Sequence, residues 1–279
     1  MDKPTDTPTI GPVEVGKVYD ERSELSDMLA GGHLHLSYWY DDQDRTPAAD
    51  ASQRITRRVV DTLGLGPDDH LLDAGCGMGA PAIRIAEETG ARVTGVTVSN
   101  VQVHGAEQKA KASGVADRVS FRYGDFMSLD FADGTFDAVM AIEALQECPD
   151  LHAALREFSR VLRAGGLIAI SDYTTETAIT AEQRRQFRPE VDIKLPTLPE
   201  WLGALRGAGF EVEEYLQCGP RVFGHRSRYL EETDAVRDQI VAKYDEETFQ
   251  GLRQEVAKFF TFGPKYLGYA IISARKPRN

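Results

Sequence analysis

The length, composition and charge of the chain exclude several classes of protein. Its 279 residues are 42% hydrophobic and 27% charged, which suits one large α/β domain with a sizeable core. The formal net charge of −12 disfavours a nucleic-acid partner or an anionic membrane surface, because both are negative themselves. No apolar run approaches the roughly 20 residues that a membrane-spanning helix needs.

The N-terminal residues and the cysteines favour a cytoplasmic protein. Residues 1–12 are polar and proline-rich, without the basic start and apolar middle of a signal peptide, so we expect a disordered leader. Cys76, Cys148 and Cys218 are far apart and odd in number, which does not suggest a disulfide framework. No CxxC or HExxH spacing offers a metal site.

From Asp69 onward, short apolar runs alternate with helical patterns, which predicts βα units and a parallel sheet. The clearest helix has an apolar stripe from Leu151 to Leu162, and we expect Gly165 and Gly166 to end it. Other helices are predicted from Ala80 and over 100–113 and 198–208. The predicted strands are 70–74, 92–98, 119–123, 136–142, 167–171, 210–217 and 269–274.

Two regions fall outside this alternation. Residues 13–63 predict two helices joined by the segment 33–40, and residues 225–260 predict charged amphipathic helices. We expect both regions to cap the carboxyl ends of the strands, where open α/β sheets bind their ligands.

A glycine-rich loop, Asp73-Ala-Gly-Cys-Gly-Met-Gly79, joins the first predicted strand to the next helix. Glycines let the backbone turn sharply and a ligand approach, and the helix start offers free N–H donors. The loop alone is weak evidence, since a tight turn without a ligand uses the same residues. Its GxGxG spacing, however, lacks the third glycine of the dinucleotide fingerprint. Asp73 suits a ligand ammonium group, and Asp125 with Phe126, after the third strand, suits an adenine.

Several motifs in order resemble the class I S-adenosylmethionine-dependent methyltransferases. The resemblance is closest to the natural-product branch, with the rebeccamycin sugar and rifamycin O-methyltransferases and the teleocidin-type C-methyltransferase/cyclases, and it extends to the cyclopropane fatty acid synthases. The segments that carry it are 73–79, 96–102, 124–126, 136–139, 162–166 and 268–275.

The resemblance implies a Rossmann-like α/β fold, a seven-stranded, mostly parallel sheet with a helical cap. It spans residues 13–279 as a single methyltransferase domain. We divide this domain into an N-terminal helical cap (13–63), a cofactor-binding core (64–218), a helical cap insertion (219–265) and the last strand (266–279).

The resemblance also implies S-adenosylmethionine as cofactor and S-adenosylhomocysteine as product. Many class I enzymes bind the ribose with an acid at the end of the second strand, but here the strand ends Thr97-Val98-Ser99. Gln102, with Thr97 nearby, would take this role, and a solvated glutamine in the first helical turn is the alternative. The implied cofactor contacts are His35, Tyr38, Asp73, Gly75, Gly77, Thr97, Gln102, Asp125, Phe126 and Ile142.

The cofactor supplies the reactive methyl group, so the protein mainly aligns the reactants, but a hydroxyl acceptor often needs a base. The related sugar O-methyltransferases carry a histidine pair where this chain has Gln146-Glu147, and only the aspartate after the fifth strand, Asp172, is retained. Asp172 and Glu147 are the candidate bases, with a solvated loop acid as the alternative for Glu147. Tyr19 resembles a residue that anchors the N-terminal helix in cyclase-like members, and it is the third catalytic candidate.

We therefore expect a methyltransferase that methylates an oxygen or a carbon of a small secondary metabolite, such as a polyketide, glycoside or terpenoid-like acceptor in antibiotic biosynthesis. One alternative couples methylation of an alkene to terpenoid cyclisation, which the missing histidine pair favours because an alkene has no proton to surrender. Another is a cofactor-binding cyclase that no longer transfers methyl groups. We expect no nucleic-acid or membrane partner, and the sequence leaves the oligomeric state open, a homo-oligomer included.

Overall fold

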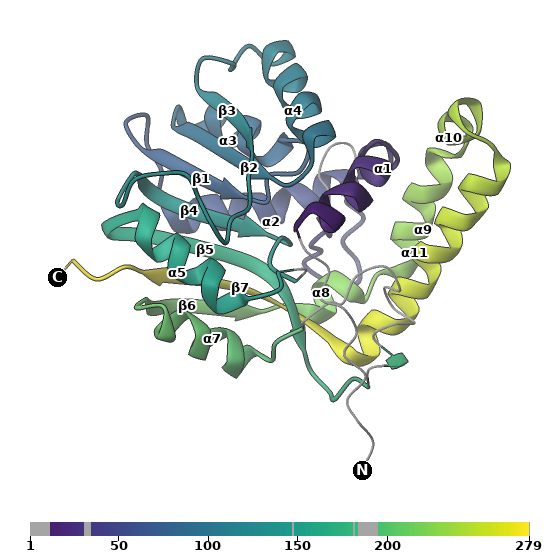
Figure 1. The fold of residues 1–279 in the computed structure, drawn as a ribbon. Coiled ribbons are helices and arrows are strands. Elements are labelled where there is room, and N and C mark those ends of the chain that lie inside the picture. The colour runs from purple at the N-terminus through teal and green to yellow at the C-terminus, as the bar shows by residue number, and fades with distance from the viewer. Residues whose placement is uncertain (1–11, 31–34, 147, 181, 184–194, 279) are drawn as a thin grey trace.

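A seven-stranded sheet forms the centre of the computed structural model, which describes residues 12–30, 35–146, 148–180, 182–183 and 195–278 (Figure 1). The strand order is β3-β2-β1-β4-β5-β7-β6, and only β7 runs opposite to the other strands. This arrangement confirms the predicted α/β class. The strands are β1 His70–Ala74, β2 Arg92–Thr97, β3 Val119–Tyr123, β4 Phe136–Ile142, β5 Leu162–Thr175, β6 Glu211–Gln217 and β7 Leu267–Arg275.

Helices cover both faces of the sheet, which explains why the central strands are apolar almost throughout. The buried cluster on one face takes side chains from α2, α3, α4, α8 and α11, and the cluster on the other face takes them from α5 and α7. The helices are α1 Pro12–Ala30, α2 Ala48–Leu63, α3 Ala80–Thr89, α4 Asn100–Ala112, α5 Leu151–Val161, α7 Leu198–Gly207, α8 Gly219–Phe223, α9 Arg226–Ala235, α10 Arg237–Lys243 and α11 Glu246–Tyr266.

The strand order reverses between β1 and β4, which pair in parallel with Asp73 opposite Met140. At such a switch point the two following connections leave in opposite directions and open a crevice at the carboxyl ends of the strands. The glycine loop follows β1 at this point, and Glu143 follows β4. The topology therefore fixes where a ligand of this sheet binds.

The junction of α5 and β5 differs from the prediction. The helix ends at Val161, and β5 begins at Leu162, which pairs with Phe136 of β4. Gly165 does not end the helix: it has a φ of +78°, and its N–H donates to Lys276 O at 2.9 Å. The glycine thus serves a turn within the extended segment. At its far end β5 runs past the predicted Ser171 to Thr175, because β7 pairs with it over that whole length.

The remaining helices lie beyond the carboxyl ends of the strands (Figure 1). There α9, α10 and α11 pack together, and α1 lies between this group and α4. Two helices thus occur within residues 13–63, as predicted, while the division into caps and core stays a prediction. The predicted leader, apart from Pro12, lies outside the described residues. Among the described helices, none is long and apolar enough to cross a membrane.

Candidate active site

The glycine loop turns sharply because its glycines adopt backbone angles that other residues rarely do. Gly75, Gly77 and Gly79 have φ values of +83°, +51° and +80°. A Cβ on Gly75 would lie 2.4 Å from the Cβ of Ala144, so the loop packs directly against the connection that follows β4. The two carboxyl ends at the switch point are therefore in close contact.

Asp73, the first residue of this loop, has the strongest mark of a ligand contact. Its side chain is 3% exposed, and its Oδ2 atom has no hydrogen-bond partner among the described residues. Burial raises the pKa of Asp73 to about 7. A buried carboxylate oxygen without a donor costs free energy unless a ligand supplies one. The ammonium group of S-adenosylmethionine is a suitable donor, so the predicted contact fits this residue.

The predicted ribose contact, Gln102, is also buried, with 3% of its surface exposed. Its Oε1 accepts a hydrogen bond from Thr97 Oγ1 at 2.6 Å, and its Nε2 donates to Ser23 Oγ at 2.9 Å. The alternative of a solvated glutamine is therefore wrong. The partnership with Ser23 could not be foreseen, because the two residues are 79 positions apart. The role toward the ribose stays a prediction.

Helix α1, which carries Ser23, is held by polar contacts on two sides. Toward α4, Asp20 accepts a hydrogen bond from Ser99 Oγ at 2.5 Å, and Asp27 pairs with Lys109 at 2.5 Å. Toward α10, Glu24 accepts a hydrogen bond from Tyr244 Oη at 3.0 Å. The helix thus bridges the cofactor side and the cap. Tyr19 lies partly buried on the same helix, and its catalytic role stays a prediction.

The residues predicted to hold the adenine lie beside the glycine loop. A Cβ on Gly75 would be 4.0 Å from Phe126 Cε1, and the Phe126 ring meets Phe158 edge-on at 6.0 Å. Asp125 Oδ1 accepts a hydrogen bond from Met127 N at 2.8 Å, which fixes the turn after β3. Ile142, at the end of β4, is 9% exposed. These positions are consistent with the predicted contacts, which stay predictions.

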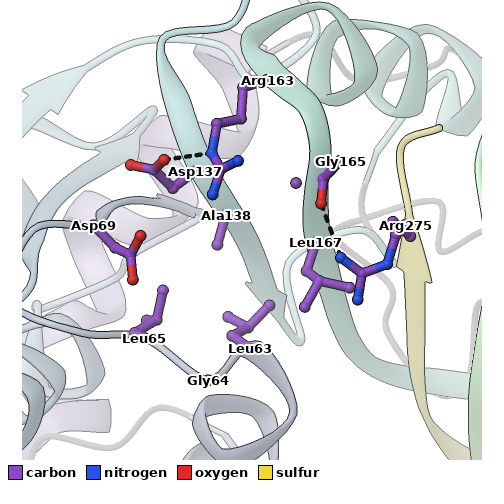
Figure 2. A pocket seen from close by; sticks show the side chains of 11 residues that line it. Leu63, Gly64, Leu65, Asp69, Asp137, Ala138, Arg163, Gly165, Leu167 and Arg275 are labelled. Carbon is purple, nitrogen blue, oxygen red and sulfur yellow. Dashed lines mark hydrogen bonds and ion pairs between the residues drawn. The ribbon is translucent and has the colours of Figure 1, made fainter. Parts of the chain in front are cut away.

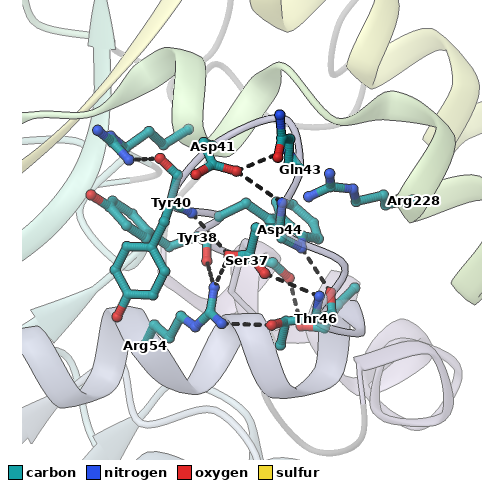
Figure 3. A network of polar contacts seen from close by, with 12 residues as sticks. Ser37, Tyr38, Tyr40, Asp41, Gln43, Asp44, Thr46, Arg54 and Arg228 are labelled. Carbon is teal, nitrogen blue, oxygen red and sulfur yellow. Dashed lines mark hydrogen bonds and ion pairs between the residues drawn. The ribbon is translucent and has the colours of Figure 1, made fainter.

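The segment 35–39, here called the strap, ties the cap to the sheet through its backbone. Four successive N–H groups donate to four different elements: Leu36 to Glu143 Oε1, Ser37 to Tyr229 Oη, Tyr38 to Ala51 O and Trp39 to Arg221 O, at 2.7, 2.8, 3.1 and 3.1 Å. Figure 3 shows the loop that continues from the strap, where Arg54 donates to Tyr38 O at 3.2 Å and pairs with Asp44. The strap is therefore firmly placed.

Two predicted cofactor contacts, His35 and Tyr38, lie on this strap. His35 Nε2 is 3.0 Å from Thr56 Oγ1 of α2. The Tyr38 ring is 2% exposed and has the guanidinium groups of Arg58 and Arg221 at 4.9 and 5.8 Å from its centroid. Both side chains thus help to seat the strap on α2 and α8. Their contact with the methionine end of the cofactor stays a prediction.

Glu143 is the residue that sequence reasoning missed. Its φ of +48° is the only positive value among the described non-glycine residues, a strained conformation that is found most often at functional sites. Its Oε1 accepts hydrogen bonds from Leu36 N at 2.7 Å and from Tyr269 Oη at 2.8 Å. Its Oε2 accepts one from Tyr173 Oη at 2.9 Å. Its position directly after the fourth strand was the available signal.

Of the two predicted bases, the structure describes Asp172 and not Glu147. Asp172 is 2% exposed, and its oxygens accept hydrogen bonds from the backbone N–H groups of Leu145 and Tyr173 at 3.0 and 2.7 Å. Burial raises the pKa of Asp172 to about 8; the N–H donors oppose this, and the charge of Glu143 adds to it. Asp172 thus holds the connection after β4. Glu147 lies outside the described residues.

Gln146 stands at the first position of the histidine pair seen in the sugar O-methyltransferases. Its Nε2 donates to Glu143 O at 3.2 Å, and the side chain is 5% exposed. Its Oε1 has no hydrogen-bond partner among the described residues. An unpaired buried amide oxygen can accept a hydrogen bond from a ligand.

An aromatic wall borders Glu143, formed by Tyr173, Phe223, Phe259 and Tyr269. The Tyr173 ring lies 5.8 Å from Phe223, 6.1 Å from Phe259 and 5.9 Å from Tyr269, between centroids. These residues come from β5, α8, α11 and β7, so the cap and the sheet meet here. These rings give the Glu143 carboxylate an apolar border on the side of the cap.

A small cavity of about 120 Å³ lies at the opposite, amino-terminal edge of the sheet (Figure 2). Its charged groups are already paired: Arg163 with Asp137 at 2.5 Å, Arg275 with Gly165 O at 2.9 Å and Asp69 with Gly66 N at 2.8 Å. It therefore has no part in the site at the switch point. Among the described residues, no cluster of His, Cys, Asp and Glu could hold a metal ion.

Comparisons with known proteins agree with this site. The methyltransferase domain family matches residues 72–170. The 27-O-demethylrifamycin SV methyltransferase of Amycolatopsis mediterranei is 35% identical, over 99% of this chain and 100% of its own length. The O-methyltransferase resE of Aspergillus sclerotiorum is 32% identical, over 94% and 97% of the two chains.

Solved structures show the same fold. The [4+2]-cyclase SpnF superimposes with a TM-score of 0.85 at 32% identity, over 98% of this chain and 99% of that chain. Geranyl diphosphate C-methyltransferase of Streptomyces coelicolor, solved with S-adenosyl-L-homocysteine, gives 0.75 at 20% identity, over 96% and 99%. The chain therefore belongs to the class I S-adenosylmethionine-dependent methyltransferases, in the branch that acts in natural-product biosynthesis.

Proposed function

We propose that the protein transfers the methyl group of S-adenosylmethionine to a hydroxyl oxygen of a small secondary metabolite, and that Glu143 accepts the hydroxyl proton. The observation that carries this proposal is the Glu143 carboxylate, held by three donors at the end of β4. The next residue, Ala144, packs against Gly75 of the glycine loop, so the carboxylate is only a residue away from the expected methionine end.

The proposed methyl transfer balances in atoms and in charge. The acceptor oxygen forms a bond to the methyl carbon as the bond between sulfur and that carbon breaks, and S-adenosylhomocysteine leaves as a neutral thioether. The hydroxyl proton passes to Glu143, whose carboxylate becomes neutral. The residues around it supply alignment and exclude water, which is most of what such a displacement requires of a protein.

The relatives support oxygen as the methylated atom. The rifamycin enzyme and resE are both named as O-methyltransferases, and each matches more than nine-tenths of this chain. The aromatic wall supports an apolar acceptor of the polyketide, glycoside or terpenoid-like class, because large apolar surfaces bind such molecules with few polar contacts. Gln146 Oε1, which has no hydrogen-bond partner among the described residues, can accept a second hydrogen bond from the acceptor.

The sequence-based catalytic candidates take supporting roles in this proposal. Asp172 positions the connection that carries Glu143, through the backbone N–H groups that it accepts. Glu147 is proposed as a further acid on the same connection, and Tyr19 as an anchor for α1. A cytoplasmic location is proposed because the three cysteines are far apart in the sequence and odd in number, which does not suggest a disulfide framework. Light scattering in solution will test for a homo-oligomer.

The test is methyl transfer from labelled S-adenosylmethionine to a panel of hydroxylated polyketides, glycosides and terpenoids. With an active acceptor, Glu143→Gln should lower turnover by about 10²-fold or more while S-adenosylhomocysteine binds as before, since a positioned base contributes about 10²–10⁴-fold. Glu211→Gln, at an exposed glutamate on the edge strand, is the matched control. Full turnover in Glu143→Gln would remove Glu143 from the mechanism.

A second candidate function rests on the cyclase SpnF, which is as similar to this chain as some of the O-methyltransferases. In this alternative the cofactor site is retained and the aromatic wall shapes a reacting polyene, with or without methyl transfer to an alkene. Incubation with polyene acceptors separates the cases by product mass. A cyclised product without a gained methyl group would favour the cyclase, and a cyclised product with one would favour coupled C-methylation.

A further inference from the structure

Two buried phenols face the Glu143 carboxylate from neighbouring strands. Tyr173 of β5 and Tyr269 of β7 are direct cross-strand partners, with their ring centroids 5.9 Å apart. They are 6% and 0% exposed. Each donates to a different carboxylate oxygen, Tyr173 at 2.9 Å and Tyr269 at 2.8 Å. The register of one antiparallel pair thus places one donor on each oxygen.

The surroundings keep the Tyr269 phenol protonated. Burial, and next the charge of Glu143, raise the pKa of Tyr269 well above its ordinary value. A buried phenol needs a partner for its O–H, and a bond from an O–H to a carboxylate is among the stronger hydrogen bonds in proteins. The arrangement is therefore suited to a charged carboxylate.

We infer that Tyr173 and Tyr269 are positioning residues, which fix both oxygens of Glu143 and set the pH at which it accepts a proton. The inference rests on the proposed function. Glu143 follows the last residue of β4 and has a strained backbone, so its side chain depends on these donors for its place. Donors to a carboxylate favour its charged form, which keeps it ionised and ready to accept a proton near neutral pH.

Other groups facing Glu143 also affect the ionisation of its carboxyl group. Asp172 of β5 bears a like charge when ionised, which opposes ionisation of Glu143. Tyr229 of α9 is also within its electrostatic reach, and desolvation raises the pKa of its phenol well above the ordinary value, so it stays neutral. From the strap, Leu36 N adds a third donor. Replacing one phenol leaves all of these groups in place. The effect of each phenol on the ionisation of Glu143 can therefore be measured separately.

The test measures ionisation of Glu143 directly. Infrared difference spectra of the S-adenosylhomocysteine-bound protein, taken against Glu143→Gln, isolate the Glu143 carboxylate band across a pH titration. Tyr173→Phe and Tyr269→Phe each remove one hydroxyl and keep the ring. Each should move the titration midpoint up by about one pH unit, because the charged form loses a donor. Tyr215→Phe, at a half-exposed tyrosine of β6, should leave the midpoint unchanged.

Unchanged midpoints in both variants would overturn the inference, whereas loss of turnover in Glu143→Gln would still uphold the proposed function. Conversely, shifted midpoints with full turnover in Glu143→Gln would uphold the positioning roles and reject Glu143 as the base. Thermal unfolding with S-adenosylhomocysteine checks that each variant is folded. A fluorinated tyrosine at position 173 or 269 keeps the fold and strengthens the donor, so the midpoint should then move down. With an active acceptor, the pH profile of turnover should follow the same shifts.

Discussion

The two halves of the site are built in different ways. In the half expected to bind the cofactor, Asp73 and its loop belong to one βα unit, so consecutive residues would meet one ligand. In the acceptor half, Glu143 receives donors from residues 107, 30 and 126 positions away, on the strap, β5 and β7. The first half therefore leaves a pattern in the sequence, while the second exists only once distant elements have packed. Each of the following changes acts mainly on one of the two halves.

Among these changes, Asp73→Ala should have the largest effect, and it should damage the cofactor half alone. The ammonium group would lose a charged partner worth about 1.5–3 kcal/mol, so the dissociation constant of S-adenosylhomocysteine should rise by about 10–100-fold. Titration calorimetry measures this, with Asp69→Ala, just before the same strand, as control. An unchanged affinity would mean that the methionine end binds elsewhere.

Asp172→Asn should damage the acceptor half and its stability. The amide nitrogen cannot accept the N–H bond that one carboxylate oxygen now accepts, so the free energy of unfolding should fall by about 1–3 kcal/mol. Turnover should fall as well, together with the stability, because the connection that carries Glu143 loses part of its support. Denaturant titration and pH profiles test this together. A loss that shrinks as the pH rises, with stability intact, would instead identify Asp172 as the base.

The pH should affect the cofactor half in a predictable direction. Burial raises the pKa of Asp73 to about 7, so below that pH it is protonated and must lose a proton before it can pair with the ammonium group. Affinity for S-adenosylhomocysteine should fall about tenfold from pH 8 to pH 6. For the same reason the unliganded protein should lose stability as the pH rises from about 4 to 7. Asp73→Asn should bind S-adenosylhomocysteine weakly at every pH. If this variant kept the wild-type pH dependence of binding, that dependence would belong to another group.

The smallest effect is expected from removing residues 1–30, which include α1. The truncated protein should fold, because few side chains of this helix are buried in the core, and lose the Ser23–Gln102 hydrogen bond. One such bond is worth about 1 kcal/mol, so cofactor should dissociate about fivefold faster. Stopped-flow measurements test this against Lys243→Ala, which releases only the outer side of α1. Unchanged dissociation would show that α1 does not retain the cofactor.

Much of the fold was predictable because hydrophobic periodicity is local. Alternating apolar runs placed all seven strands, and Thr97, at the end of β2, lies beside Gln102 as expected. The end of α5 was misplaced because paired glycines are typical of a helix stop, while here pairing with β4 starts the strand before them. The predicted ends of β5 and β7 fell short since only their mutual pairing extends them.

Most of the acceptor half could not be predicted from the sequence, because its contacts join distant elements. Glu143 stands in an ordinary run, Ile-Glu-Ala-Leu, and only its position after the fourth strand distinguishes it from a solvated acid. Its partners became visible only through the β5–β7 register and the path of the strap. Asp172 was found by resemblance, but its bonds to backbone N–H groups, which give it a structural task, were not foreseeable from residue type.

The strap also bears on how the chain folds. Its bonds to Glu143 and Tyr229 close loops of 107 and 192 residues, and such distant contacts form late because their closing costs entropy before any contact compensates for it. During synthesis, β1 and β4 emerge from the ribosome well before α9 and β7, so the glycine loop can be complete while the acceptor half still lacks its donors. In hydrogen exchange during refolding, the N–H groups of residues 36–39 should therefore become protected after those of the central strands.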